Sequence, residues 1–332
     1  MLPVLVLTAG LGTRLRPLTD LLAKPALPVA GQPLIARILR WLASEGVDDA
    51  VLNLSHLPET VASVVGDGSQ FGMRVRYSWE QPVLGSAGGP RHALPLLGSR
   101  FLIVNGDTLT NVVLGDVIDT HTRSGAAVTM ALVPHPAPGR YGGVHVNDAG
   151  LVDRFTARNA KGAERGTGAP RATEPGGVQG TPPENNDATD GPLWHYIGVQ
   201  VVEASVFADL PDNEPAESVG GIYRPLVKQG LVAGYRSDAV FRDIGKPGDY
   251  LDTAFAVAHD EGRLGSVIEE DGAEYDASAR LDRVILWPGS RVAAGASLTN
   301  CIVAGAHVPA GMRAEHAVLM PGPSGTEIVP FP

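Results

Sequence analysis

Short apolar runs alternate with stretches of helical spacing over residues 1–134 of the chain. A strand buried on both faces reads as a near-continuous apolar run, whereas a helix places its apolar residues three and four apart. Strands are predicted at residues 2–7, 51–54, 74–79, 101–104 and 129–133, and helices at residues 33–45, 58–65 and 114–124. This alternation predicts an α/β fold with a mixed, mostly parallel Rossmann-like sheet and helices on both faces.

The periodic pattern stops between Arg158 and Gly191, where Gly, Pro, Thr, Asn and Glu dominate. Such a segment buries too little apolar surface to offset the entropy lost on ordering. Strand-like sequence then resumes at Trp194. We therefore expect a flexible insert at about residues 159–192 within a first domain of residues 1–263, and we favour a plain insert over a lid.

Residues 264–332 follow a different pattern, with glycines and single apolar residues at short, regular spacing. Residues 289–298 are echoed by residues 305–314 at an offset of 16. Stacked coils need small residues at their turns and an apolar residue pointing inward, which favours a short left-handed β-helix over an irregular β-rich tail. Two or three coils are too few to be stable alone. We expect them to dock on the first domain, and a homo-oligomer through them is possible.

Composition limits the class of partner. The net charge of −10 over 332 residues argues against nucleic acid, although one nucleotide needs only a few cations and backbone amides. The one cysteine, Cys301, excludes an intramolecular disulfide framework and gives no zinc motif. The chain has no apolar run of membrane-spanning length, and its apolar N-terminus lacks the basic region of a signal peptide. These features predict a cytoplasmic protein with no membrane partner.

The sequence LTAGLGTRLRPLT at residues 7–19 directly follows the first predicted strand. Gly10 and Gly12 let the backbone approach a ligand and aim amides at phosphate oxygens, and Arg14 adds a fork-shaped cation. A Rossmann fingerprint needs a third glycine where Leu15 stands, and a P-loop needs a Gly-Lys-Ser/Thr step that does not follow. The loop therefore predicts a polyphosphate site of another kind.

Residues 10–19, followed by Lys24 and Pro25, resemble the signature of the sugar-1-phosphate nucleotidyltransferases. Further segments are similar to motifs of that family and appear in its order. They are the base-binding segment at residues 80–89, the metal-binding Gly-Asp step at residues 105–107, the sugar-pocket segments at residues 141–144 and 196–198, and residues 241–250. The resemblance covers residues 2–260 and implies that family's fold and activity.

The resemblance also implies a set of site residues. For the nucleotide they are Ala9, Gly10, Gly12, Thr13, Arg14, Glu80, Gly85, Ser86 and Ala87. For the sugar phosphate they are Gly143, Arg158, Tyr196 and Gly198. Asp107 and Asp243 are the expected Mg²⁺ ligands, and Arg14, Lys24 and Asp107 the catalytic residues.

In this family's reaction, a sugar 1-phosphate oxygen attacks the α-phosphorus of a nucleoside triphosphate (NTP), and pyrophosphate leaves. The nucleophile is already an anion, so positioning and electrostatics must supply most of the rate. Arg14 is expected to neutralise the pyrophosphate, and Lys24 to reach the α-phosphate. A hard cation suits the carboxylates of Asp107 and Asp243, although the first could instead cap a helix and the second shape a turn.

The chain departs from the family near Phe155, where the family's Glu-Lys-Pro, whose lysine grips the sugar phosphate, is matched by Thr-Ala-Arg158. Arg158, or a residue from elsewhere in the chain, is expected to bind that phosphate instead.

Base and sugar preference depend on two signals. The carboxylate of Glu80 could accept both donors on the guanine edge, and the β-helix tail fits guanylyl- and glucose-type relatives better than the short muramate-type uridylyltransferases. We therefore favour GTP and mannose 1-phosphate, with uridylyl or thymidylyl transfer to glucose 1-phosphate or another sugar 1-phosphate as the alternative. A non-catalytic subunit that binds sugar nucleotides is disfavoured, because the signature arginine, lysine and aspartates are all present.

Overall fold

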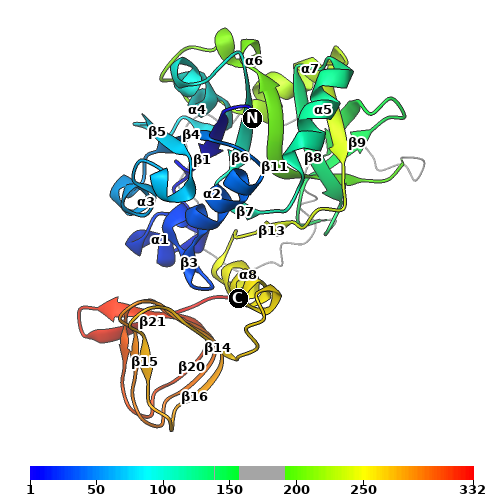
Figure 1. The fold of residues 1–332 in the computed structure, drawn as a ribbon. Coiled ribbons are helices and arrows are strands. Elements are labelled where there is room, and N and C mark those ends of the chain that lie inside the picture. Colours follow the sequence, from blue (N-terminus) through cyan, green and yellow to red (C-terminus); the bar gives the residue numbers. More distant parts are fainter. Residues whose placement is uncertain (138, 157–190) are drawn as a thin grey trace, which may run out of the picture.

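The computed structural model describes residues 1–137, 139–156 and 191–332. The predicted insert falls almost entirely on residues 157–190, outside the described residues. Figure 1 shows a large α/β part with a smaller β part beneath it. Among the described residues, no helix is both long and apolar enough to cross a bilayer.

A nine-stranded sheet forms the centre of the larger part. Its strands are β1 (Val4–Leu7), β4 (Asp49–Leu54), β5 (Arg74–Trp79), β6 (Arg100–Asn105), β8 (Val128–Pro134), β9 (Gly143–Val146), β10 (Val152–Thr156), β11 (Trp194–Glu203) and β12 (Val232–Arg236). The order is β10-β9-β11-β6-β1-β4-β5, with β8 paired to both β11 and β12. All strands except β10 and β11 run in the same direction. The predicted mixed, mostly parallel sheet is confirmed.

Two apolar cores lie on opposite faces of this sheet, because successive side chains of a strand point to opposite sides. Val4 and Val6 of β1 belong to one core, and Leu5 between them belongs to the other. The first face is covered by α2 (Leu34–Ser44), α3 (Pro58–Val65), α5 (Leu114–Ser124) and α8 (Pro247–Asp260). The second face is covered by α4 (Gly85–Ala93), α6 (Ser205–Ala208) and α7 (Arg224–Lys228). Helices therefore cover both faces, as predicted.

Short elements connect the sheet to the site. They are the 3-10 turns η1 (Thr13–Leu15), η2 (Lys24–Ala26), η3 (Ser69–Phe71) and η4 (Leu94–Leu96), the helix α1 (Leu18–Leu21), the hairpin of β2 (Pro28–Val29) and β3 (Gln32–Pro33), the strand pair β7 (Thr108–Leu109) and β13 (Arg242–Asp243), and the π-helical turn η6 (Val219–Tyr223). The pairing of β7 with β13 sets Asp243 opposite Thr108. Two regions that lie far apart in the sequence are thereby joined beside Asp107.

Helices α4 and α8 are among those that the sequence pattern does not predict. Residues 80–89 resemble a base-binding loop, yet Gly85–Ala93 form helix α4. Its glycines allow very close packing: a Cβ atom added at Gly88 would lie 2.4 Å from the Glu214 carbonyl oxygen. Tertiary packing overrides the low helix propensity of these residues. The sequence pattern also predicts no element at Pro247–Asp260, where α8 forms.

The C-terminal part stacks strands that are parallel except for the last. They are β14 (Val267–Glu269), β15 (Glu274–Tyr275), β16 (Arg280–Leu286), β17 (Arg291–Val292), β18 (Ser297–Val303), β19 (His307–Val308), β20 (Arg313–Gly322) and β21 (Gly325–Pro330). Arg291 pairs with His307 and Ser297 with Arg313, which matches the 16-residue offset predicted from the sequence. The last strand, β21, pairs antiparallel with β20.

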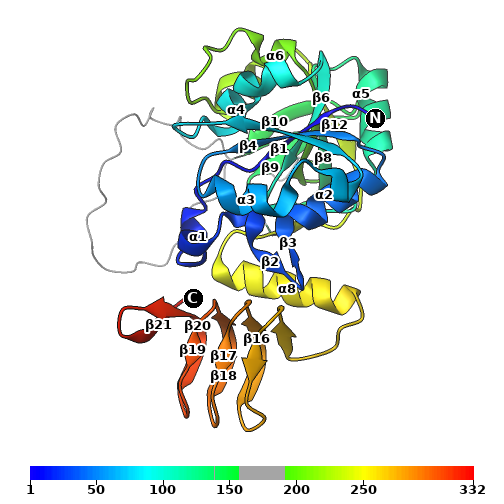
Figure 2. The ribbon, with the colours of Figure 1, turned by 60° about the vertical axis from the view of Figure 1, so that its left-hand side comes forward.

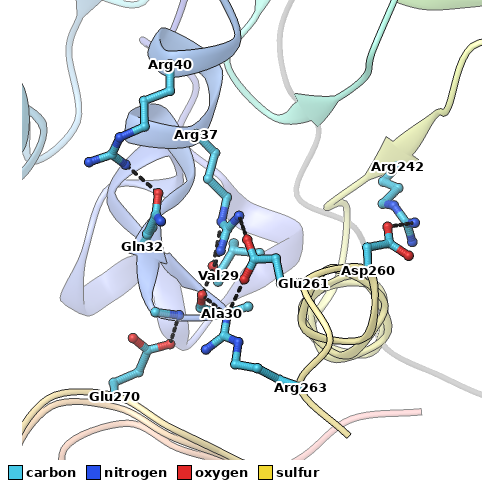
Figure 3. A network of polar contacts seen from close by, with 11 residues as sticks. Val29, Ala30, Gln32, Arg37, Arg40, Arg242, Asp260, Glu261, Arg263 and Glu270 are labelled. Carbon is cyan, nitrogen blue, oxygen red and sulfur yellow. Dashed lines mark hydrogen bonds and ion pairs between the residues drawn. The ribbon is translucent and has the colours of Figure 1, made fainter. Parts of the chain in front are cut away.

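This C-terminal part packs on α8 and lies against the β2–β3 hairpin (Figure 2). The Trp287 indole N–H donates to the Tyr250 hydroxyl at 2.8 Å, and that hydroxyl donates to the Pro28 carbonyl. Glu270 Oε1 accepts the Gly31 N–H at 2.9 Å. Figure 3 shows this contact beside Arg37, Glu261 and Arg263, which connect the hairpin to the end of α8. The hairpin that follows Lys24 is therefore held by α2 through Arg37, by Arg263 after the end of α8, and by the C-terminal part through Glu270.

Candidate active site

The predicted site residues gather where parallel strands end, which is where open α/β sheets bind ligands. Strand β1 leads into the glycine loop, and β5 leads into Glu80. Strand β4 carries Asn53 near its end, and β6 ends at Asn105, two residues before Asp107. Register between neighbouring strands brings these four chain segments to a single edge of the sheet.

A cavity of about 250 Å³ opens at this edge, and we call it the first cavity. Its lining residues are Leu7, Thr8, Ala9, Gly10, Lys24, Pro25, Asn53, Glu80, Val83, Gly85, Ser86, Asn105, Gly106 and Asp107. Seven residues predicted from the sequence line it: Ala9, Gly10, Lys24, Glu80, Gly85, Ser86 and Asp107. The glycine loop and the start of α4 thus form opposite parts of one pocket.

The two glycines of the loop have different roles. No atom comes within 4 Å of a Cβ added at Gly10, so this exposed backbone is open to a ligand. Gly12 has a left-handed backbone with φ 62°, and an added Cβ would lie 2.6 Å from Thr19 Cγ2. Its carbonyl also accepts the Thr19 hydroxyl at 2.9 Å. Gly12 therefore shapes the turn that carries Thr13 and Arg14, both exposed.

Glu80 lies at the back of the first cavity with 3% of its surface exposed. Its Oε1 accepts the Asn53 amide at 2.7 Å, and its Oε2 accepts the Leu84 N–H at 2.8 Å. Asn53 Oδ1 in turn accepts the Thr8 N–H at 2.7 Å, which fixes the orientation of the Asn53 amide. Both carboxylate oxygens thus bind protein donors. These two contacts occupy one acceptor site on each oxygen, which disfavours guanine recognition by Glu80.

The start of α4 requires a further correction. Ala87 is fully buried, and its N–H donates to the Ala216 carbonyl at 2.9 Å, so it offers no group to a nucleotide. Gly85 and Ser86, one and two residues earlier, do line the first cavity. The Ser86 hydroxyl oxygen accepts the Ser218 N–H at 3.0 Å, which ties this turn to the residue that precedes η6.

Lys24 and Asp107 form an ion pair at the boundary of the first cavity, with 2.6 Å between Nζ and Oδ2. Only 9% of the Lys24 surface is exposed. Asp243 lies close enough that burial and the Asp107 carboxylate both raise its pKa, while Lys24 and Arg14 oppose that shift. These two carboxylates and two cations therefore lie near one another, and their roles stay predictions.

The two carboxylates suit a hard divalent cation, because a bound cation would relieve the repulsion that raises the Asp243 pKa. No group of three or more His, Cys, Asp or Glu side chains in the described part of the chain is arranged to hold a metal. Mg²⁺ usually binds through one or two carboxylates, with water and substrate phosphates completing its shell. Asp107 and Asp243 fit this mode of Mg²⁺ binding.

A second cavity of about 370 Å³ lies beside Asp243 and the glycine loop. Its lining residues are Arg14, Arg140, Tyr141, Gly142, Asp243, Lys246 and Asp249. Two histidines contact the backbone of one wall. His135 Nε2 and His195 Nδ1 lie 3.2 and 3.3 Å from the Gly142 carbonyl oxygen. The two cavities divide the predicted residues, with Lys24 and Asp107 on the first and Arg14 and Asp243 on the second.

The predicted sugar-phosphate residues fall in different places. Gly143 is buried and its N–H faces the Thr156 hydroxyl at 3.2 Å, so its neighbour Gly142, not Gly143, reaches the second cavity. Gly198 has φ 80°, and a Cβ there would lie 2.8 Å from the Asn105 side chain. It therefore lets Asn105 pack against β11 and line the first cavity.

Tyr196 is half-buried in β11, near the carboxylate of Asp107. Burial raises its pKa, and the neighbouring Tyr223 and Asp107 raise it further. Arg158, the residue predicted in place of the family's lysine, lies outside the described residues.

Several lining residues are absent from the sequence prediction, namely Asn53, Asn105, Arg140, Lys246 and Asp249. The two asparagines stand at the ends of predicted strands, and that position was an available signal. Lys246 and Asp249 stand within residues 241–250, which resemble a family motif, whereas no such signal marks Arg140 in the connection between β8 and β9.

The chain matches the protein family described as "Nucleotidyl transferase" over residues 3–260. It therefore belongs to that family and is a nucleotidyltransferase, and the predicted resemblance is confirmed. It is 27% identical over 320 residues to the mannose-1-phosphate guanylyltransferase of Mycobacterium tuberculosis, covering 87% of this chain and 81% of that protein.

Two further comparisons show how widely substrates vary among relatives. The chain is 46% identical over 110 residues to the N-acetylmuramate alpha-1-phosphate uridylyltransferase of Neisseria meningitidis, covering 32% of this chain and 48% of that protein. Its fold is similar to that of HddC from Yersinia pseudotuberculosis, solved in complex with GMP-PN, with a TM-score of 0.60 and 21% identity over 77% of this chain and all of that chain. The relatives agree on the class of reaction and differ in base and sugar.

Proposed function

We propose that this protein transfers a nucleotidyl group from an NTP to a sugar 1-phosphate, forming a nucleoside-diphosphate sugar and releasing pyrophosphate. The observation that carries the proposal is the Lys24–Asp107 pair, which lines the first cavity together with Gly10 of the glycine loop. A phosphate-bearing substrate on each side of this pair would bring nucleophile and α-phosphorus together. The chain then has to position two polyanions and offset the charge that builds up between them.

In this proposal the first cavity holds the base and ribose, and the glycine loop holds the triphosphate. The open backbone at Gly10 and the exposed Arg14 would contact the β- and γ-phosphates. Lys24 would exchange its Asp107 partner for an α-phosphate oxygen as charge develops there. The nucleophile is the sugar phosphate itself, so no side chain is needed as a general base.

Asp107 and Asp243 are proposed to hold Mg²⁺. When bound, the ion would neutralise phosphate charge as a Lewis acid. Asp107 is oriented for this role by Lys24, and Asp243 by the pairing of β13 with β7.

GTP with mannose 1-phosphate is the first substrate pair to test, because the mycobacterial relative of that name is similar over most of both chains. Base preference would then come from groups other than the Glu80 carboxylate. Uridylyl transfer is the second candidate, favoured by the higher but more local identity to the neisserial uridylyltransferase.

The experiment measures pyrophosphate release with Mg²⁺, the four NTPs and dTTP, against mannose, glucose and N-acetylmuramate 1-phosphates. Turnover with one pair is the expected result and identifies both substrates. Tight nucleotide binding without turnover for any pair would instead support a non-catalytic sugar-nucleotide-binding subunit.

We also propose that the C-terminal coils form a left-handed β-helix and could contact a second copy of the chain. Their 16-residue strand offset and buried interior support a coil of this kind. An experimentally determined structure, with the mass of the particle in solution, would test both points.

A further inference from the structure

The second cavity carries more positive charge than the family resemblance assigns to it. Arg14, Arg140 and Lys246 line it, against the carboxylates of Asp243 and Asp249. Of these five charged residues, only Arg14 and Asp243 were expected at the site. The other three residues come from α8, the residue before it, and the connection between β8 and β9.

These groups converge on Gly245. A Cβ added there would lie 3.1 Å from Asp249 Oδ2, 3.2 Å from Asp243 Oδ2 and 3.6 Å from Arg14 Nη1. The absence of a side chain at this position therefore allows a guanidinium and two carboxylates to surround one small region. An anion bound in the second cavity would lie within reach of the carboxylate proposed to hold the metal.

Arg140 is fixed within this cavity. Its Nη2 lies 2.7 Å from Asp249 Oδ1, and its guanidinium lies over the Tyr141 ring at 5.0 Å from the centroid. Its side chain nonetheless remains 47% exposed. A guanidinium has five N–H donors, so the pairing with Asp249 leaves others for a ligand.

Lys246 is exposed, and no carboxylate in the described part of the chain forms an ion pair with it. It occupies the N-cap of α8, with Pro247 at the first helical position. The positive end of the 14-residue helix adds to its own charge.

We propose that Lys246 and Arg140 bind the phosphate of the sugar 1-phosphate, a phosphomonoester dianion. The inference rests on the proposed function and names the group that this chain uses in place of the family's missing lysine. The walls of the cavity favour the sugar phosphate over pyrophosphate, because Tyr141 and Gly142 belong to a segment similar to the family's sugar pocket. Lys246 is thus a substrate-binding residue for the nucleophile.

Steady-state kinetics of Lys246→Gln and Arg140→Gln test the proposal, once turnover of the wild type has established the reaction. Each loses a charge-assisted contact, so KM for the sugar 1-phosphate should rise about tenfold or more, while KM for the NTP stays within about twofold. Lys246→Arg should recover most of the loss. Lys228→Gln, at an exposed lysine that ends α7 outside both cavities, is the matched control.

A rise in KM for the NTP, or for pyrophosphate in the reverse reaction, would instead place these cations on the leaving group and overturn the proposal. Unchanged constants for Lys246→Gln would also overturn it. Thermal melting of each variant separates lost binding from lost folding.

Calorimetric binding gives a readout independent of turnover. Mannose 1-phosphate and glucose 1-phosphate are titrated into the wild type and Lys246→Gln, with and without a non-hydrolysable NTP analogue, and free mannose serves as the uncharged control. Weaker binding of a sugar phosphate to the variant is expected, and equal binding contradicts the proposal. Binding by a wild type that shows no turnover would sink the proposed function and leave the phosphate subsite intact.

Discussion

The Lys24 ammonium donates to the Asp107 carboxylate across 2.6 Å, although 83 residues separate the two in the chain. Lys24 is largely buried in the turn η2, and Asp107 follows the buried strand β6. The side chain of Lys24 is 11% exposed and that of Asp107 33%, so the pair is partly shielded from water and each group retains capacity for another partner. The pair therefore positions both groups at the first cavity.

Replacing Lys24 with methionine is expected to lower kcat/KM by at least about a hundredfold, because no other cation of the first cavity can reach the α-phosphate. The apolar stem is kept, so we expect the fold to survive. Pyrophosphate release and thermal melting measure the two effects. Lys228→Met is the control, and a Lys24→Met enzyme with wild-type turnover would refute the assigned role.

Asp243→Asn should stabilise the protein in the absence of metal while abolishing turnover. Burial and the Asp107 carboxylate raise the Asp243 pKa, so the ionised side chain destabilises the fold at neutral pH. An amide removes that charge and also a proposed metal ligand. Urea unfolding in EDTA gives the first effect and pyrophosphate release the second. A less stable Asp243→Asn protein would contradict this account of the site.

Glu80→Gln is expected to weaken all nucleotides alike, without changing the preferred base. The Thr8 N–H fixes the orientation of the Asn53 amide, so a glutamine NH₂ at position 80 must face a donor from either Asn53 or Leu84. Loss of one such buried bond costs about 1–3 kcal/mol. The NTP panel measures the outcome. A selective loss of GTP would restore Glu80 as the residue that recognises guanine.

Glu270→Gln is expected to make stability less dependent on pH. Burial raises the pKa of Glu270, against the Gly31 N–H and the nearby Arg263 and Arg37. The folded state therefore binds more protons than the unfolded state, and stability falls as pH rises from 4.5 through the folded pKa. The amide oxygen can still accept the Gly31 N–H. Urea unfolding between pH 4.5 and 8 should show a relative gain for the variant at the upper end.

Glu269→Gln is the matched control, because this exposed neighbour makes no contact with the hairpin in the described structure. Equal slopes of stability against pH for the wild type and Glu270→Gln would show that the buried carboxylate does not influence how the C-terminal part docks.

The sequence by itself determined much of the sheet and most of the triphosphate end of the site, although β9, β10 and β12 were not predicted. Apolar runs such as residues 101–104 form strands that are buried on both faces, and Pro58–Val65 form the predicted helix. Gly10 and Asp107 were recognised because they follow predicted strands, and Lys24 because it stands in the signature that resembles the family's. Local spacing is sufficient where chemistry and backbone geometry are set within a few residues.

Tertiary structure decided what depends on distant partners. Residues 85–93 are helical because Gly88 and Gly89 pack against backbone and side-chain atoms from other segments, against their own propensity. The Glu80 carboxylate, apparently free for a base, is held by Asn53 and Leu84. Arg140 and Lys246 meet only when α8 packs beneath the sheet, and a pattern read over ten residues contains no information about a contact between segments a hundred residues apart.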